Sequence, residues 1–158
     1  RRKQFPLSEA IDLMRQVAFA VSAAHEAGIV HRDLKPENIF PETSGGTRMV
    51  KVLDFGIAKL RDDLTVPGTL TAHGELIGSP TYMSPEQCEG EQLDARSDVY
   101  SLGCVLFEML AGRPPFLSRS VPALLMKHVS EAPASLASLG VLVTPAVEDA
   151  VEYQCGQT

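Results

Sequence analysis

Apolar residues between positions 8 and 28 recur every three or four residues, which is the spacing of one face of an α-helix. Ser8 is the expected N-cap, because its hydroxyl can accept a hydrogen bond from a backbone amide of the first turn. Gly28 ends the pattern, so the sequence predicts one amphipathic helix. The apolar face of this helix consists of Ile11, Met14, Val17, Val21 and Ala24.

Three short apolar runs follow, at residues 29–30, 39–40 and 49–53, and we expect each to form a short strand. A Ser-Gly-Gly sequence at residues 44–46 indicates a turn between the last two strands. Residues 58–83 mix Thr, Gly, Pro and Asp without a clear period. A loop of this length is uncommon in a compact domain unless it has a function, so we interpret it as functional.

The second half of the chain is expected to be helical. Residues 99–110 are apolar on nearly every side, which indicates a buried helix, and Gly112 ends it. Weaker helical patterns follow at residues 121–129 and 144–155. The predicted fold is therefore mainly α, with short strands in the first half.

Size and charge limit the class of protein. The chain has 158 residues, of which 44% are hydrophobic, and this suits one domain with one core. A formal net charge of -6 argues against nucleic acid as a partner, because the field of the protein repels phosphate groups. The three cysteines form no Cys-x-x-Cys pair, and no membrane-spanning segment is present. We expect a cytoplasmic protein, or the cytoplasmic part of a membrane-anchored one.

Two segments carry the candidate chemistry. Residues 31–38 read His-Arg-Asp-Leu-Lys-Pro-Glu-Asn, and residues 54–56 read Asp-Phe-Gly directly after a predicted strand. Phosphoryl transfer depends on positioning and on neutralising charge with magnesium, and these segments supply a carboxylate base, a cation and oxygen ligands. In this order and at this separation the two segments support each other, and together they match the signature of the protein kinases.

The chain resembles the protein kinases over nearly its whole length. Ser84-Pro85-Glu86 occupies the position where their Ala-Pro-Glu triplet closes the activation segment, and the variant with Ser is similar to that of bacterial kinases of the eukaryotic type. The resemblance implies that residues 1–158 are one partial kinase domain, which runs from the helix before the catalytic loop to the penultimate helices. This would be an incomplete C-terminal lobe: a helical bundle with short strands that carry the catalytic and metal-binding loops.

The resemblance also implies roles for individual residues. Asp33 would be the catalytic base and Lys35 would balance charge on the transferred phosphoryl group. Asn38 and Asp54 would bind Mg²⁺. The implied function is ATP-dependent phosphorylation of serine or threonine hydroxyls on protein substrates, in signal transduction. The implied nucleotide-binding set is Lys35, Glu37, Asn38, Phe40 and Asp54.

A regulatory set follows from the same resemblance. Arg32 would receive a phosphate from the activation loop, and Thr69 or Thr71 would carry it, with Thr65 less favoured. The alternative, that these threonines are ordinary polar loop residues, stays open. Ser79 would bridge the base and the neighbouring lysine through its hydroxyl.

Other matching residues are expected to be structural. His31 and Phe55 would stack in an apolar column, and Asp98 would cap backbone amides of the catalytic loop. Phe40 would form the floor of the adenine pocket, although simple core filling explains it equally well.

The family's glycine-rich loop, strand lysine and partner glutamate do not occur before Pro6. We therefore expect the missing N-terminal lobe of the same chain to be a partner, and residues 1–158 alone to have very low activity. We also expect Glu86 to be unpaired, because no family-type arginine partner occurs before Thr158. The alternative function is a non-catalytic, kinase-like interaction module. An unrelated magnesium-dependent hydrolase is a third and remote hypothesis.

Overall fold

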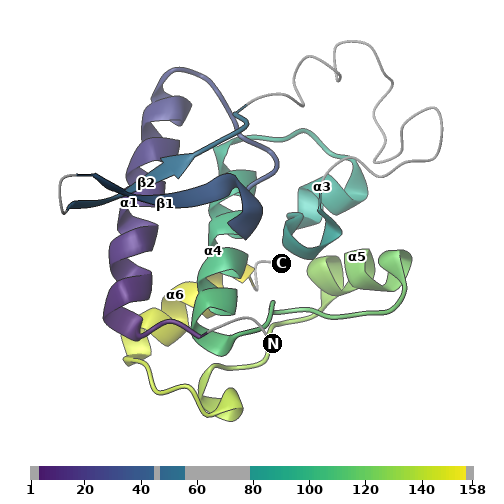
Figure 1. Ribbon diagram of the computed structural model, residues 1–158. Coiled ribbons are helices and arrows are strands. Elements are labelled where there is room, and N and C mark those ends of the chain that lie inside the picture. Colours follow the sequence, from purple (N-terminus) through teal and green to yellow (C-terminus); the bar gives the residue numbers. More distant parts are fainter. Residues whose placement is uncertain (1–3, 45–46, 56–78, 156–158) are drawn as a thin grey trace.

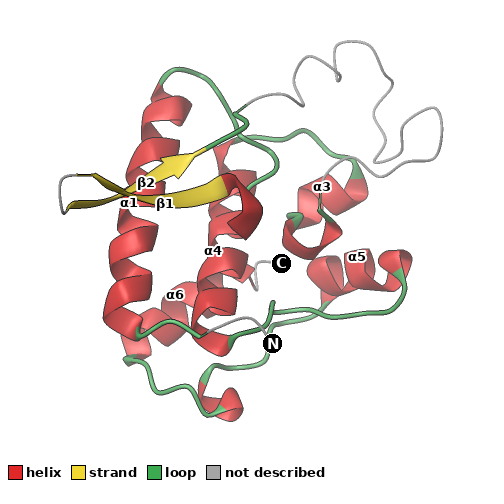
Figure 2. Ribbon diagram, viewed as in Figure 1, coloured by secondary structure: helices red, strands yellow, loops and turns green. Residues whose placement is uncertain are grey.

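The computed structural model describes residues 4–44, 47–55 and 79–155 of the chain. These residues form a largely helical fold with one small two-stranded sheet (Figures 1 and 2). The helices and strands are α1 (Leu7–Glu26), β1 (Ile39–Ser44), β2 (Thr47–Val52), α3 (Pro85–Glu89), α4 (Ala95–Ala111), α5 (Val121–Ser130) and α6 (Pro145–Cys155). Short 3₁₀ turns cover Pro36–Asn38, Pro80–Tyr82 and Ala137–Leu139.

Helix α1 begins at Leu7, and the predicted Ser8 N-cap is wrong. The Pro6 carbonyl already accepts a hydrogen bond from the Ala10 amide at 3.0 Å, so Ser8 lies inside the first turn rather than before it. At the other end the prediction is confirmed: Gly28 follows the helix with a φ of 74°, a left-handed conformation that glycine adopts without strain.

The buried face of α1 differs by part of a turn from the predicted one. Its buried members are Ala10, Leu13, Val17 and Val21, whereas Ile11 is 43% exposed. Val17 and Val21 pack with Leu34 of the following loop and with apolar residues of the hairpin. The helix thus forms one wall behind the residues that follow it in sequence.

Strands β1 and β2 form an antiparallel hairpin in which Ile39 pairs with Val52 and Ser44 with Thr47. Strands were predicted at both places, and the structure confirms them. The strand predicted at residues 29–30 is wrong, because the structure has no regular element there. The hairpin lies against α1, where the Gln16 side chain accepts a hydrogen bond from the Val50 amide at 3.0 Å. This contact occupies a backbone donor of β2, which pairs only with β1 among the described residues.

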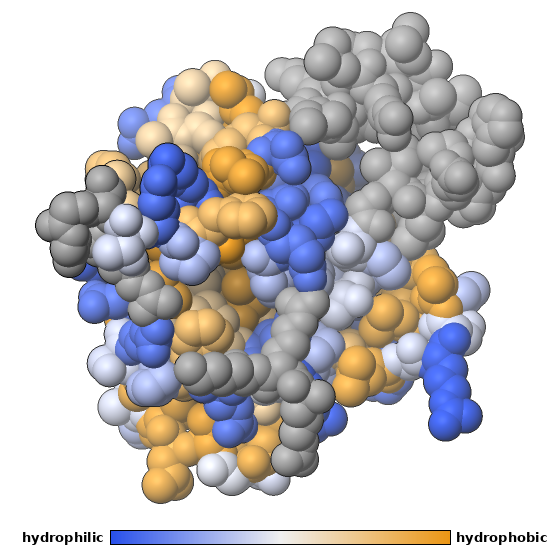
Figure 3. Space-filling view, viewed as in Figure 1, coloured by the Kyte–Doolittle hydropathy of each residue, from blue (hydrophilic) through white to orange (hydrophobic). Residues whose placement is uncertain are grey.

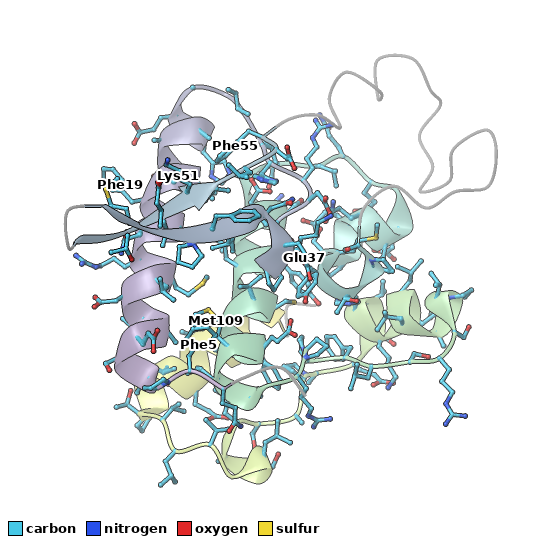
Figure 4. The ribbon with its side chains drawn as sticks, in the orientation of Figure 1. Phe5, Phe19, Glu37, Lys51, Phe55 and Met109 are labelled. Carbon is cyan, nitrogen blue, oxygen red and sulfur yellow. The ribbon has the colours of Figure 1, made fainter. Side chains whose placement is uncertain are left out.

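Helix α4 is the buried centre of the fold, as predicted, and ends at Gly112 with a φ of 71°. It packs against α1, α3 and α6, so helices surround it on several sides (Figure 1). The Phe107 side chain is 1% exposed and Cys104 is fully buried. Near the C-terminal end of α4 the Phe5 amide donates to the Met109 carbonyl at 2.8 Å, and these two residues lie close together in Figure 4.

Helices α5 and α6 occupy the places where helical patterns were predicted. Helix α6 packs against α4, and its Val151 joins the core around Phe107. Apolar side chains also remain on the surface, over the hairpin and over α5 (Figure 3); they include Phe40 and Met126, at 50% and 60% exposure. No helix in the described part of the chain is long and apolar enough to span a membrane.

Candidate functional site

The loop between α1 and β1 carries the candidate catalytic residues, and α4 holds its backbone. The Asp98 side chain is 1% exposed. Its two carboxylate oxygens accept hydrogen bonds from the backbone amides of His31 and Arg32, both at 2.8 Å. The structure therefore contains the cap that was expected of Asp98, and the start of the loop is fixed to the central helix.

Asp33 is the centre of a small polar cluster. Its carboxylate contacts the Lys35 ammonium at 2.5 Å on one oxygen, and its other oxygen accepts from the Ser79 backbone amide at 3.3 Å. The Asn38 side-chain amide donates to the Asp33 carbonyl at 2.9 Å. The Asp33 side chain is 30% exposed, so its carboxylate is within reach of a molecule that approaches from solvent.

The hairpin brings Asp54 next to this cluster. The Leu53 amide donates to the Asn38 carbonyl at 2.9 Å, so Asp54 directly follows a residue that is bonded to Asn38. The His31 ring bonds the Leu53 carbonyl at 2.8 Å. Asp54 has a φ of 63°, which is unusual for a residue other than glycine, and its side chain is exposed. A second carboxylate therefore lies at the edge of the same site.

His31 and Phe55 pack together as expected, with ring centroids 4.8 Å apart. Figure 4 shows Phe55 just beyond the end of β2. Because His31 also bonds the main chain before Asp54, its role in this geometry is to connect the two loops.

The donor set fits a magnesium ion. Asn38 uses its amide nitrogen on the Asp33 carbonyl, which leaves its side-chain oxygen as a potential ligand, and Asp54 adds an exposed carboxylate. Among the described residues there is no cluster of three or more His, Cys, Asp or Glu side chains that would form a metal cage. Magnesium commonly binds through one or two protein oxygens and completes its shell with phosphate and water, so two ligands are sufficient.

Glu86 has a partner, so the prediction that it is unpaired is wrong. The Ser97 hydroxyl, in the first turn of α4, donates to the Glu86 carboxylate at 2.5 Å. Glu86 is also only partly buried, so it keeps part of its hydration. The Cys88 thiol lies near it, and burial, followed by the charges of Glu86 and Glu89, raises the pKa of Cys88 to about 12. Cys88 is therefore a neutral thiol at physiological pH.

The other predicted site residues contact the cluster in a different way, are exposed on β1 and in the turn before it, or lie outside the described part. Ser79 contacts Asp33 through its backbone amide, whereas the prediction assigned that role to its hydroxyl. Phe40 is half exposed on β1 and Glu37 is exposed in the turn before it. Thr65, Thr69 and Thr71 lie outside the described residues.

Sequence reasoning missed two residues that hold the loop. His25, near the end of α1, bonds the Asp98 carboxylate at 2.7 Å. Gln87, in α3, donates its side-chain amide to the Arg32 carbonyl at 2.7 Å. Gln87 was detectable, because Ser84 and Gln87 have the spacing of a capping box. His25 gave no such signal, since its partner lies on a helix far away in sequence.

Comparisons with known proteins place the chain among related sequences. A family model described as the protein kinase domain matches residues 1–151. A probable serine/threonine-protein kinase of Corynebacterium efficiens is 51% identical over 126 residues, which cover 80% of this chain and 18% of the relative. The serine/threonine-protein kinase pkn3 of Myxococcus xanthus is 46% identical over 134 residues, which cover 83% of this chain and 24% of the relative.

A third relative, the serine/threonine-protein kinase PknB of Mycobacterium leprae, is 45% identical over 128 residues, which cover 81% of this chain and 20% of the relative. The chain belongs to the protein kinase family. It spans roughly a fifth of the length of these bacterial relatives.

Proposed function

We propose that this chain is the C-terminal lobe of a serine/threonine protein kinase, which transfers the terminal phosphate of ATP to a serine or threonine hydroxyl of a protein substrate. The observation that carries this proposal is the cluster in which Asp33 contacts Lys35 and is bonded to Asn38, with Asp54 beside it. The three relatives are named as serine/threonine-protein kinases, and this supports the acceptor class.

Asp33 is the proposed base. It accepts the proton of the substrate hydroxyl while that oxygen forms a bond to the terminal phosphorus, and the bond to the ADP oxygen breaks. Lys35 offsets negative charge on the moving phosphoryl group, and its 2.5 Å contact orients the Asp33 carboxylate before the substrate arrives. Magnesium, held by Asn38 and Asp54, would neutralise charge on the phosphates.

Recognition of the nucleotide needs more than these residues. The 158 residues contain no glycine-rich Gly-x-Gly-x-x-Gly loop, so we assign the remaining phosphate contacts to an N-terminal lobe of the same protein. Phe40 and Glu37 would lie on the nucleotide side of the cluster, and the 50% exposure of Phe40 suits a surface that a second lobe covers. Arg32 would bind a phosphorylated Thr69 or Thr71, Ser79 would stabilise the base, and Glu86 would anchor the end of the segment.

Magnesium dependence tests this function. The full-length protein is incubated with γ-labelled ATP and a mixture of serine, threonine and tyrosine peptides, while the Mg²⁺ concentration is varied. We expect label on serine or threonine, and we expect Asp54→Asn to raise the half-maximal Mg²⁺ concentration about tenfold or more. Asp12→Asn removes an equivalent charge at a site that is 75% exposed, and it should leave the curve unchanged.

Label that appears without metal, or only on tyrosine, would contradict the proposal. Tight binding of a protein partner with no label transferred at any Mg²⁺ concentration would favour the interaction-module alternative.

A further inference from the structure

Gln87 makes two different hydrogen bonds with the two ends of its side-chain amide. Its oxygen accepts from the Ser84 backbone amide at 3.0 Å, and its nitrogen donates to the Arg32 carbonyl at 2.7 Å. The Ser84 hydroxyl in turn accepts from the Gln87 backbone amide at 3.4 Å, which completes a capping box at the start of α3. Because the oxygen is fixed by the cap, the nitrogen is aimed at the catalytic loop.

The carbonyl that receives this bond belongs to a residue in an unfavourable conformation. Arg32 has a φ of 68°, in the left-handed region that residues other than glycine seldom occupy. Such a conformation persists only where surrounding contacts impose it. The Arg32 amide is held by Asp98 at 2.8 Å and its carbonyl by Gln87 at 2.7 Å, so α4 and α3 fix this residue from its two sides.

The same carbonyl is part of the peptide unit that leads into Asp33. The nitrogen of that unit, the Asp33 amide, bonds the His31 ring at 3.3 Å. With the oxygen held by Gln87, both polar atoms of the peptide have partners. The orientation of this peptide places the Asp33 backbone and thereby sets where its carboxylate lies.

We propose that Gln87 is a positioning residue that aligns the proposed base Asp33, and that α3 acts on the catalytic loop through this side chain. The inference rests on the proposed function and deepens it. It gives the residue after Ser84-Pro85-Glu86 a part in the phosphoryl-transfer step that a helix cap alone does not explain. Glutamine is suited to this position because it carries an acceptor and a donor on one planar group.

A glutamate at position 87 separates the role of this side chain in the helix cap from its role as donor to the Arg32 carbonyl. Gln87→Glu retains the size of the side chain and an oxygen for the Ser84 amide, so the capping box survives. Its second oxygen faces the Arg32 carbonyl and cannot donate when ionised, so the peptide before Asp33 is pushed out of place. Gln87→Met removes both roles. Gln92→Glu makes the same change of charge at an exposed position nearby and is the matched control.

Kinetics of the full-length protein test the inference. We expect Gln87→Glu to lower kcat for phosphate transfer about tenfold to a hundredfold, with the KM for ATP within about twofold of wild type. Its thermal midpoint should stay close to that of wild type, whereas Gln87→Met should lower both kcat and the midpoint. Gln92→Glu should match the wild type. A kcat for Gln87→Glu within twofold of wild type would overturn the inference. A decrease in kcat that is no larger than the decrease in the fraction of folded protein would also overturn it.

A crystal structure of the Gln87→Glu variant makes the test independent of activity. The expected result is an intact Ser84 cap with the Arg32 carbonyl turned away from residue 87. An unchanged Arg32 backbone would overturn the positioning role even if the wild type transferred no phosphate. A displaced Arg32 in a chain without transferase activity would instead support the structural link and count against the proposed function.

Discussion

His128 is a polar side chain within an apolar setting on α5. It is 2% exposed, its ring bonds the Tyr100 hydroxyl at 2.7 Å, and its centroid lies 4.9 Å from that of Phe116. Burial lowers the pKa of His128 to about 4, against the opposing effect of the Pro80 and Thr81 backbone. The ring is therefore neutral in the folded protein at physiological pH.

This pKa predicts a specific dependence of stability on pH. In the unfolded chain the pKa of His128 is about 6.5. At pH values between this pKa and the lower pKa in the folded protein, His128 binds a proton in the unfolded chain and not in the folded one. The free energy of unfolding should therefore fall as the pH decreases through this window, by about 1 kcal/mol per pH unit. Urea unfolding at pH 7 and pH 5.5 measures the effect. His128→Leu should show a smaller pH dependence than wild type, and equal slopes would contradict the assignment.

At the scale of elements, α4 supports the loop that carries Asp33. Asp94, the N-cap of α4, and Asp98, within its first turn, have different roles. Asp94 caps the helix at an exposed position, where its carboxylate accepts from the Arg96 amide at 2.8 Å, and hydrogen bonds from Arg96 lower the pKa of Asp94. Asp98, one turn later, is buried and binds the amides of His31 and Arg32. Its loss would leave two backbone donors without this acceptor.

We therefore predict that Asp98→Ala lowers the free energy of unfolding by about 3 kcal/mol, because buried donors lose a charged acceptor. Asp94→Ala should cost clearly less, since water can satisfy an exposed helix end. Chemical denaturation of both variants checks the order. A loss for Asp94→Ala that equals or exceeds the loss for Asp98→Ala would show that the loop does not depend on α4 in this way.

The elements also differ in how far the sequence predicts them. The central helix and the hairpin follow from local patterns, since a run that is apolar on all sides and two runs around a Gly-Gly turn have few alternative structures. The start of α1 was misplaced by two residues, because Pro6 can contribute its carbonyl to the helix even though no side chain caps it. The prediction of a strand at residues 29–30 was wrong because two apolar residues do not specify pairing without a neighbouring strand.

Contacts between segments that are distant in the sequence were harder to predict. The pairing of Asp98 with the loop was predicted from family resemblance, but the partners of Glu86 and Gln87 depend on how α3 packs against α4 and the loop. Such packing is not encoded in any local pattern. The residues of the proposed catalytic cluster were predicted from their motif, while the contacts of His25 and Gln87 with Asp98 and Arg32 became visible only in the fold.

At the scale of the whole molecule, the helices form a support with the proposed chemistry at one edge. The α1 helix, the hairpin and α4 pack around the loop that carries Asp33, and α6 packs against α4 below the hairpin in the view of Figure 1. Loops on a rigid scaffold commonly carry catalytic residues, because the scaffold fixes their geometry without covering them. The architecture thus leaves the Asp33 carboxylate partly exposed, at 30%.

The most direct test of the central claim is the rate of phosphate transfer by the full-length protein with and without the proposed base. With γ-labelled ATP, Mg²⁺ and a serine or threonine substrate, we predict that Asp33→Ala lowers the rate roughly a hundredfold to ten-thousandfold. Asp12→Ala, at an exposed position on α1, is the control and should match wild type. A rate that is unchanged in Asp33→Ala would contradict the account, because the cluster around Asp33 would then have no part in the chemistry.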